Sequence, residues 1–324
     1  MLAIISALTE SALALPAFTG LLAAASWGLG CLMFDRAHSH ADSSARPPSA
    51  AGMNLFKNSL ATSCFVLVAA IMGSTYPTAD SFWPLFWSGV IGFAIGDSLY
   101  FAAFPLAGVQ VTAMMGNLTP PIAGLIAWTF LGESFEAQSF LWMAVVLGGV
   151  SLVILDPVKR QKSEPKRSRK QLFTGLLFAF GAAVSQGAAI VIAHSSFEGV
   201  AILPGTVVRL IGGLAAALVI AGLVSLLSSG RSGGAGLAET LRPIRSVTLM
   251  RALLIPTFFA TLVSLPLHSA TVQVAPGHLS ALILSTSPLF ILPLGFKFGV
   301  RQGPISVLGT LIGFGGVAGL IWMG

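Results

Sequence analysis

The stretch GVQVTAMMGNLTPPIAGLIAWTFLGES, Gly108–Ser134, reads as one long apolar helix with a polar fault in its middle. Asn117, Pro120 and Pro121 lie about halfway along this run. A proline in a helix interior removes one backbone hydrogen bond and clashes with the preceding turn, which costs about 3 kcal/mol or more. Whether the fault is a defect or a useful feature depends on what surrounds this helix.

The composition indicates that the surroundings are lipid. Of the 324 residues, 55% are hydrophobic and 9% are charged, whereas about 25% of the residues in a soluble domain are charged. The mean hydropathy is +0.89. A soluble chain of this length could not cover its surface with so few charged side chains. The composition therefore predicts an integral membrane protein.

Apolar stretches divide the chain into ten segments that are each about long enough to cross a hydrocarbon core of ~30 Å. We expect spans at 17–34, 55–73, 84–104, 109–131, 138–155, 172–193, 205–227, 249–271, 279–297 and 304–322. The longest polar segment, 156–171, follows the fifth span. The sequence thus predicts an all-α membrane protein of two five-helix units, 17–155 and 172–322, joined by a basic linker.

The two predicted units match each other at an offset of 168 residues. Placing 99–152 on 267–320 without a gap puts MMGNLTPPI over LILSTSPLF, so that Pro120 falls on Pro288 and Asn117 on Ser285. Identities are sparse, and the match rests on these unusual positions. It indicates an internal duplication.

Basic residues are concentrated in alternate loops. We assign sixteen of the seventeen Lys and Arg residues, Lys57 among them, to the loops after spans one, five, seven and nine. The other loops carry the acidic residues Asp80, Glu133, Glu136 and Glu198. The positive-inside rule makes the basic side cytoplasmic, so the termini are expected outside the cell membrane and the 156–171 linker inside it.

Five spans per unit is an odd number, so the second unit must enter the membrane upside down relative to the first. Inverted-topology repeats of this kind are a common plan of secondary transporters. The charge pattern agrees, because Glu133 of the first unit aligns with Arg301 of the second. The architecture therefore favours a transporter.

Several motifs of the first unit occur together. GDSLYFAAFPLAGVQVTAMMGNLTPPIAGLIAWTFLGE, 96–133, contains Asp97, a mid-span proline and a final Leu-Gly-Glu, and the glycine-rich VVLGGVSLVI follows. ASWGLG, 25–30, lies in the first span. The second unit keeps Ser-x-x-Pro at 285–288 but has Gly-Val-Arg at the Leu-Gly-Glu position. With these motifs, nearly the whole chain resembles the EamA-type repeat of the drug/metabolite transporter superfamily.

The resemblance implies a substrate cavity between the two units, lined mainly by spans one, three, four, six, eight and nine. It implies no particular substrate, because the family moves amino acids, drugs, sugars and other metabolites.

The polar fault suits such a cavity, because broken helix in a membrane is tolerated only against protein or water. Pro120 and Pro288 would free backbone carbonyls beside Asn117 and Ser285, near the midplane where transporter sites lie. The alternative is that the prolines only kink helices for packing. The full set of predicted substrate-binding residues is Asn117, Thr119, Pro120, Ser285, Ser287, Pro288, Tyr100, His268, Trp27 and Gln186.

Asp97 is the most informative single residue. A carboxylate near the centre of a span costs roughly 2.5–3.5 kcal/mol on insertion scales, so it is by default a functional hypothesis. It could carry a coupling proton or pair with a substrate ammonium. The alternative is a hydrogen-bonded Asp97 that joins helices through Ser98 or Tyr100.

Two other polar residues of the spans have alternatives of their own. His268 could titrate near neutral pH, but a neutral histidine bonded inside the bundle is the more frequent case. Arg209 could attract an anionic substrate, but its expected behaviour is to extend its guanidinium to the lipid head groups. Gly309 and Gly313 are a small-residue pair that favours close helix packing, so the last span is read as scaffold.

No catalytic motif, metal-ligand spacing or phosphate-binding glycine loop is evident, so we expect neither an enzyme nor a cofactor or metal. The expected partners are a small polar organic solute, the lipid bilayer and protons. Nucleic acid is not expected, because the basic residues lie in short loops, and a homodimer remains open. A membrane-embedded structural or assembly protein is the alternative function.

Overall fold

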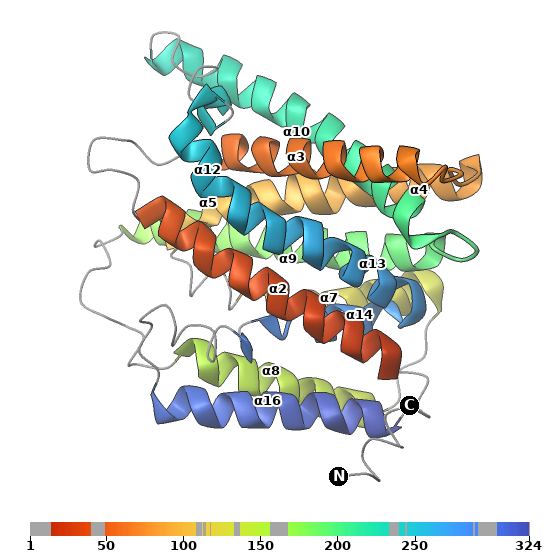
Figure 1. Cartoon of the computed structure of the whole chain (residues 1–324). Helices are drawn as coiled ribbons and strands as arrows, with labels where there is room; N and C mark the ends of the chain where they lie inside the picture. Colours follow the sequence, from red (N-terminus) through yellow and green to blue (C-terminus); the bar gives the residue numbers. More distant parts are fainter. Residues whose placement is uncertain are drawn as a thin grey trace.

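The computed structural model describes residues 14–39, 49–107, 112, 115–116, 118–132, 137–155, 168–232, 240–243, 245–287, 289–290 and 303–323. Every regular element in these ranges is a helix (Figure 1). Six of the helices are long and apolar enough to cross a membrane. The all-α membrane class is therefore confirmed, whereas the count of ten spans stays a prediction.

The long helices of the first unit fall close to the predicted spans. They are α2 (Ala14–Ser39), α3 (Ala50–Ile71), α4 (Ala79–Gly89), η1 (Val90–Gly96), α5 (Asp97–Ala107), α7 (Thr119–Ile126), η2 (Ala127–Leu131) and α8 (Ala137–Leu155). Here η marks a π-helix, which has wider turns than an α-helix. The segments α4, η1 and α5 together form one continuous span of 29 residues.

The remaining helices follow the linker. They are α9 (Arg169–Ser196), α10 (Ile202–Ser232), α12 (Val247–Thr257), η4 (Phe258–Val263), α13 (Ser264–Val274), α14 (Gly277–Leu284) and α16 (Pro304–Met323). The segments α12, η4 and α13 again form one continuous span. A capping box between Ser168 and Gln171 fixes the start of α9.

The fault that opens the sequence analysis interrupts the helix instead of kinking it. A turn at Leu118 precedes α7, in which the Leu118 amide donates to the carbonyl of Met115 at 3.0 Å. Pro120 and Pro121 therefore lie in the first turn of a new helix. A missing N–H costs little there, because the first amides of a helix have no intrahelical partner. The cost of an interior proline does not apply.

A matching interruption follows α14. The chain turns at Ser285 and Thr286, and the Thr286 amide donates to the carbonyl of Ile283 at 3.2 Å. Donor and acceptor each lie 168 residues after the corresponding atoms at Leu118 and Met115. Two of the predicted site residues, Asn117 and Pro288, lie outside the described residues.

The π-helices interrupt two long spans at positions that also correspond. η1 begins at Val90 and η4 begins at Phe258, which is again an offset of 168 residues. Single π-turns inside α-helices occur frequently at functional sites. In this protein η1 ends immediately before Asp97.

The helices pack in pairs that join the two predicted units. Both α12 and α13 lie along α2, α9 lies along η1 and α5, α10 along α3, and α14 along α7. The pair α8 and α16 lies side by side at the bottom of the view in Figure 1. The pairs bring together segments that are far apart in the sequence, so the interior of the bundle is built from both units.

Small residues set the spacing of α8 and α16. A Cβ atom on Gly149 would lie 2.5 Å from the backbone nitrogen of Gly313 and 2.6 Å from the carbonyl oxygen of Gly309. The two backbones therefore touch at this crossing, as the small-residue pair predicted.

Candidate functional site

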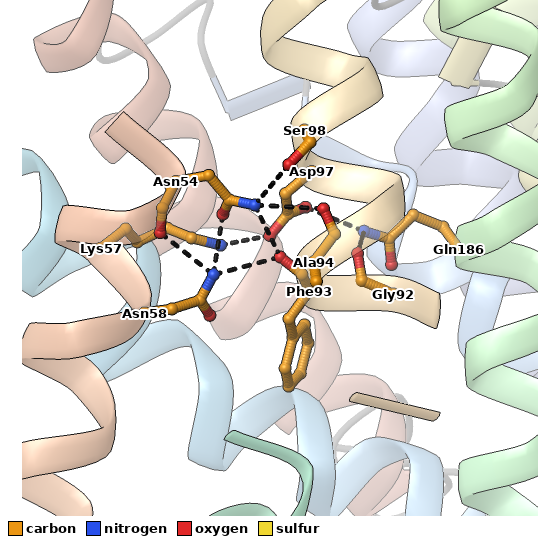
Figure 2. A network of polar contacts seen from close by, with 9 residues as sticks. All are labelled: Asn54, Lys57, Asn58, Gly92, Phe93, Ala94, Asp97, Ser98 and Gln186. Carbon is orange, nitrogen blue, oxygen red and sulfur yellow. Dashed lines mark hydrogen bonds and ion pairs between the residues drawn. The ribbon is translucent and has the colours of Figure 1, made fainter. Parts of the chain in front are cut away.

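A buried ion pair lies where α3 meets the start of α5. The Lys57 ammonium donates to Oδ2 of Asp97, and the two side chains are only 4% and 6% exposed. Figure 2 shows both groups turned toward each other between the helices. Removing two charges from water costs several kcal/mol per ion, so a buried pair is stable only with good geometry and further hydrogen bonds.

Gln186 of α9 provides a further bond to the carboxylate. Its Nε2 donates to Oδ1 of Asp97 at 3.0 Å and lies 3.3 Å from the carbonyl oxygen of Gly92. A Cβ atom on Gly96 would lie 3.3 Å from the same nitrogen, so the glycine leaves room for the amide. Asp97 is thus held between a helix of the first unit and a helix of the second.

Two asparagines on α3 complete the network. Nδ2 of Asn54 donates to the carbonyl of Phe93 at 3.0 Å and to Oγ of Ser98 at 2.9 Å. Nδ2 of Asn58 donates to the same Phe93 carbonyl at 3.2 Å and to Oδ1 of Asn54 at 2.8 Å. Because the asparagines bind a carbonyl of η1, they stabilise the π-turn that positions Asp97 (Figure 2).

The position of Lys57 corrects the sequence analysis. Lys57 is not a loop residue: it lies in the third turn of α3 and is 3% exposed. A lysine near the edge of an apolar run resembles a topology signal, which explains the error. The spacing of Asn54, Lys57 and Asn58, at i, i+3 and i+4, places three polar groups on one helical face and was the signal available.

The partners of Asp97 also differ from those expected. The alternative reading joined Asp97 to Ser98 or Tyr100, but the structure pairs it with Lys57 and Gln186. Ser98 instead accepts from Asn54.

The predicted site residues of α2 and α5 are aromatic. The ring of Tyr100 packs edge-on against Phe104, with centroids 4.8 Å apart. Trp27 packs against a cluster that contains Phe34 and Leu253. Both side chains are half-buried and make apolar contacts in the structure.

The hydroxyl groups predicted around the second fault bond within their own segment. Ser285 donates to the carbonyl of Leu282 at 2.8 Å and Ser287 to that of Leu284 at 3.0 Å. Thr119 is buried at the start of α7. Of the predicted residues that the structure describes, Asp97 and Gln186 are brought into direct hydrogen-bonding contact.

The expectation that Arg209 extends to the lipid head groups is wrong. Arg209 is 0% exposed. Its Nε donates to Oγ of Ser88 at 2.9 Å, and its Cζ lies 4.7 Å from the centroid of the Phe93 ring. α10 crosses α4 so closely that a Cβ atom on Gly89 would overlap the Arg209 carbonyl. This tight crossing keeps the side chain inside the bundle.

A hollow of about 290 Å³ lies at the end of α9, away from the ion pair along that helix. Its lining consists of His194, Ser195, Glu198 and Gln273. Gln273 donates to the carbonyl of Val200 at 2.6 Å and ties α13 to the loop after α9.

Comparisons with known proteins bear on the first half of the chain and on the fold. Residues 14–155, which include Lys57 and Asp97, match the model of the EamA-like transporter family. One solved structure, described as "Crystal structure of protein", is 16% identical over 94% of this chain and 95% of its own, with a TM-score of 0.64. This similarity concerns the fold alone. A search of curated proteins gave no match.

Proposed function

Because residues 14–155 belong to the EamA-like transporter family, the chain is a membrane transporter in general terms, and we propose that it is a secondary transporter of a small polar organic metabolite. In this proposal it works by alternating access between two inverted five-helix units, 17–155 and 172–322, and Asp97 couples the movement to protons.

The helix pairs support the two-unit arrangement. Exchanging each predicted span for its counterpart turns the contact between α2 and α13 into the contact between α9 and α5, and both contacts are present. The π-turns and the helix interruptions also recur at the offset of 168 residues. A rocking motion of one unit against the other would act on these paired helices.

The Lys57–Asp97 pair is the observation that carries the proposal. A proton that reaches Asp97 removes its charge and breaks the pair, which leaves the Lys57 ammonium without its counter-ion. Lys57 then needs water, another anion or loss of its own proton, since an unpaired buried charge is costly. Proton binding is thereby linked to a rearrangement between α3, α5 and α9, which belong to both proposed units.

Flux measurements test the proposal directly. The purified full-length protein is reconstituted in lipid vesicles, and accumulation of a panel of amino acids, sugars and organic acids is measured with and without a pH gradient. We expect at least one small polar metabolite to accumulate above its external concentration, and a protonophore to abolish this accumulation. Absence of flux for the whole panel would favour a structural or assembly protein.

Topology provides a second test. In a background without Cys31 and Cys64, a cysteine placed in the 156–171 linker should be protected from an impermeant thiol reagent in intact cells. A cysteine at Asp80, in the exposed first turn of α4, should react. The reason is that the linker carries seven of the basic residues, which are retained on the cytoplasmic side. Labelling of the linker from outside would reverse the orientation.

The first fault provides a third test. We expect Asn117→Leu to weaken apparent substrate affinity about threefold to tenfold, the equivalent of one hydrogen bond of about 0.5–1.5 kcal/mol. Leu125→Ala, at a side chain that is 58% exposed, is the control and should leave affinity unchanged. Apparent affinity is measured from the concentration dependence of transport. Unchanged affinity in Asn117→Leu would assign the fault to packing.

A further inference from the structure

The guanidinium of Arg209 is buried with most of its hydrogen-bonding capacity unused. Ser88 accepts from Nε, but neither Nη1 nor Nη2 has a hydrogen-bond partner, although both atoms are fully buried. Leaving a buried donor unsatisfied costs about 1–3 kcal/mol, and more when the group is charged. The protein maintains this arrangement at a cost in stability.

The unused donors lie in a region that has further unpartnered polar atoms. They include Oγ1 of Thr206 on α10, Oγ1 of Thr261 on η4 and Nε2 of His268 on α13. Thr206 precedes Arg209 by three residues and so lies on the same side of α10. His268 is close enough to Arg209 for their charges to interact. Hydrogen-bonding groups from three helical segments therefore surround the guanidinium without satisfying one another.

The charges of the interior point to the missing partner. The charged side chains buried in the described part of the chain are Lys57, Asp97 and Arg209. Asp97 is already paired with Lys57, so one positive charge has no counter-charge. Phe93 connects the two cations: its ring centroid lies 4.7 Å from Cζ of Arg209 and 6.0 Å from Nζ of Lys57. A single anion would balance the charge of the whole group.

We propose that Arg209 binds the carboxylate of the transported substrate, so that the substrates are organic acids or amino acids. Nη1 and Nη2 form a planar fork that matches the two oxygens of a carboxylate. Ser88 and Phe93 fix the orientation of the fork by holding Nε and the guanidinium face. This inference rests on the proposed transport function and adds the chemical class of the substrate.

The distance between Arg209 and the ion pair suits a small molecule. Ser88, which holds Arg209, precedes Asp97 by nine residues on one continuous span, which corresponds to about 14 Å at 1.5 Å per residue. A solute whose carboxylate is bound at Arg209 would extend toward Lys57 and Asp97. Substrate binding and proton binding would then act on the same set of helices.

The test measures binding without requiring transport. The thermal unfolding of the full-length protein in detergent is followed with sodium acetate, lactate or benzoate, each compared with its neutral amide at constant ionic strength. We expect at least one carboxylate to raise the unfolding temperature of the wild type, and the amides to have no effect, because ligand binding stabilises the folded state by mass action. Arg209→Gln should weaken this binding tenfold to a hundredfold, since a charge-assisted hydrogen bond is lost.

Arg251→Gln is the matched control, because Arg251 is exposed on α12, and it should respond as the wild type does. If Arg209→Gln does not fold, Arg209→Lys decides, because it keeps the charge but loses the fork and should bind at least threefold more weakly. Equal responses of wild type and Arg209 variants, or no response to any carboxylate, would overturn the inference. Sodium chloride or sulfate that stabilises as well as the carboxylates would assign the site to an inorganic anion and refute the substrate class. Carboxylate binding without any flux in vesicles would uphold the anion site and refute transport instead.

Discussion

Asp97→Asn is expected to abolish accumulation driven by a pH gradient while the protein remains folded and inserted. Asparagine has nearly the same shape as aspartate and can still accept from Gln186, but it cannot take up the coupling proton. Uptake by vesicles with an imposed pH gradient should fall to the level of vesicles without one. Accumulation that still responds normally to the gradient would remove Asp97 from the mechanism.

A charge-balanced double variant separates coupling from folding. Asp97→Asn alone leaves Lys57 without its counter-ion, and breaking a buried pair in this way typically costs about 3–5 kcal/mol. Replacing both partners, as in Lys57→Met with Asp97→Asn, removes both charges and is often neutral or stabilising. We expect the double variant to regain the thermal stability of the wild type without regaining gradient-driven accumulation. Recovery of both properties would show that the pair has only a structural role.

Gly149→Leu is expected to disrupt the pair formed by α8 and α16. The new side chain would enter the backbone of α16 at Gly309 and Gly313, 2.5–2.6 Å from where its Cβ begins. Backbone atoms cannot rotate away as a flexible side chain can, so the cost should exceed the 1–3 kcal/mol typical of overpacking. Thermal unfolding of the purified protein, together with the yield of folded protein, measures the effect.

The neighbouring glycine offers the control. Gly148 lies on the same helix, but a Cβ atom there would meet nothing within 4 Å. Gly148→Leu should leave the stability unchanged within about 0.5 kcal/mol, as surface substitutions usually do. Equal stability of the two leucine variants would mean that α8 and α16 are not held in the contact described above.

The sequence analysis located the helices well, because hydropathy and length determine a membrane span. The spans predicted at 172–193 and 84–104 correspond to helices at Arg169–Ser196 and 79–107, each extended by a few residues at its ends. The interruption near Pro120 was also visible, since proline constrains the backbone locally. These features depend on residues that are close together in the sequence.

The candidate site was predicted only in part, because it depends on contacts between distant residues. Asp97 was recognisable as a carboxylate in an apolar span, but its partner Lys57 is 40 residues away and its partner Gln186 is 89 residues away. The burial of Arg209 depends on Ser88, which is 121 residues away. Without the fold, a lysine or arginine near the end of a span cannot be distinguished from a residue that faces the head groups.

The π-turn η1 has a mechanical consequence for Asp97. A π-turn contains one residue more than an α-turn, so its conversion to regular α-helix would move the following helix along by one residue. One residue of α-helix corresponds to a rotation of about 100° and a rise of 1.5 Å. If η1 relaxed in this way, α5 would turn relative to α4 and carry the Asp97 carboxylate off the face that meets Lys57 and Gln186. The ion pair would then open through a change of helical register, in which α4 and α3 keep their places and only the screw of one helix advances.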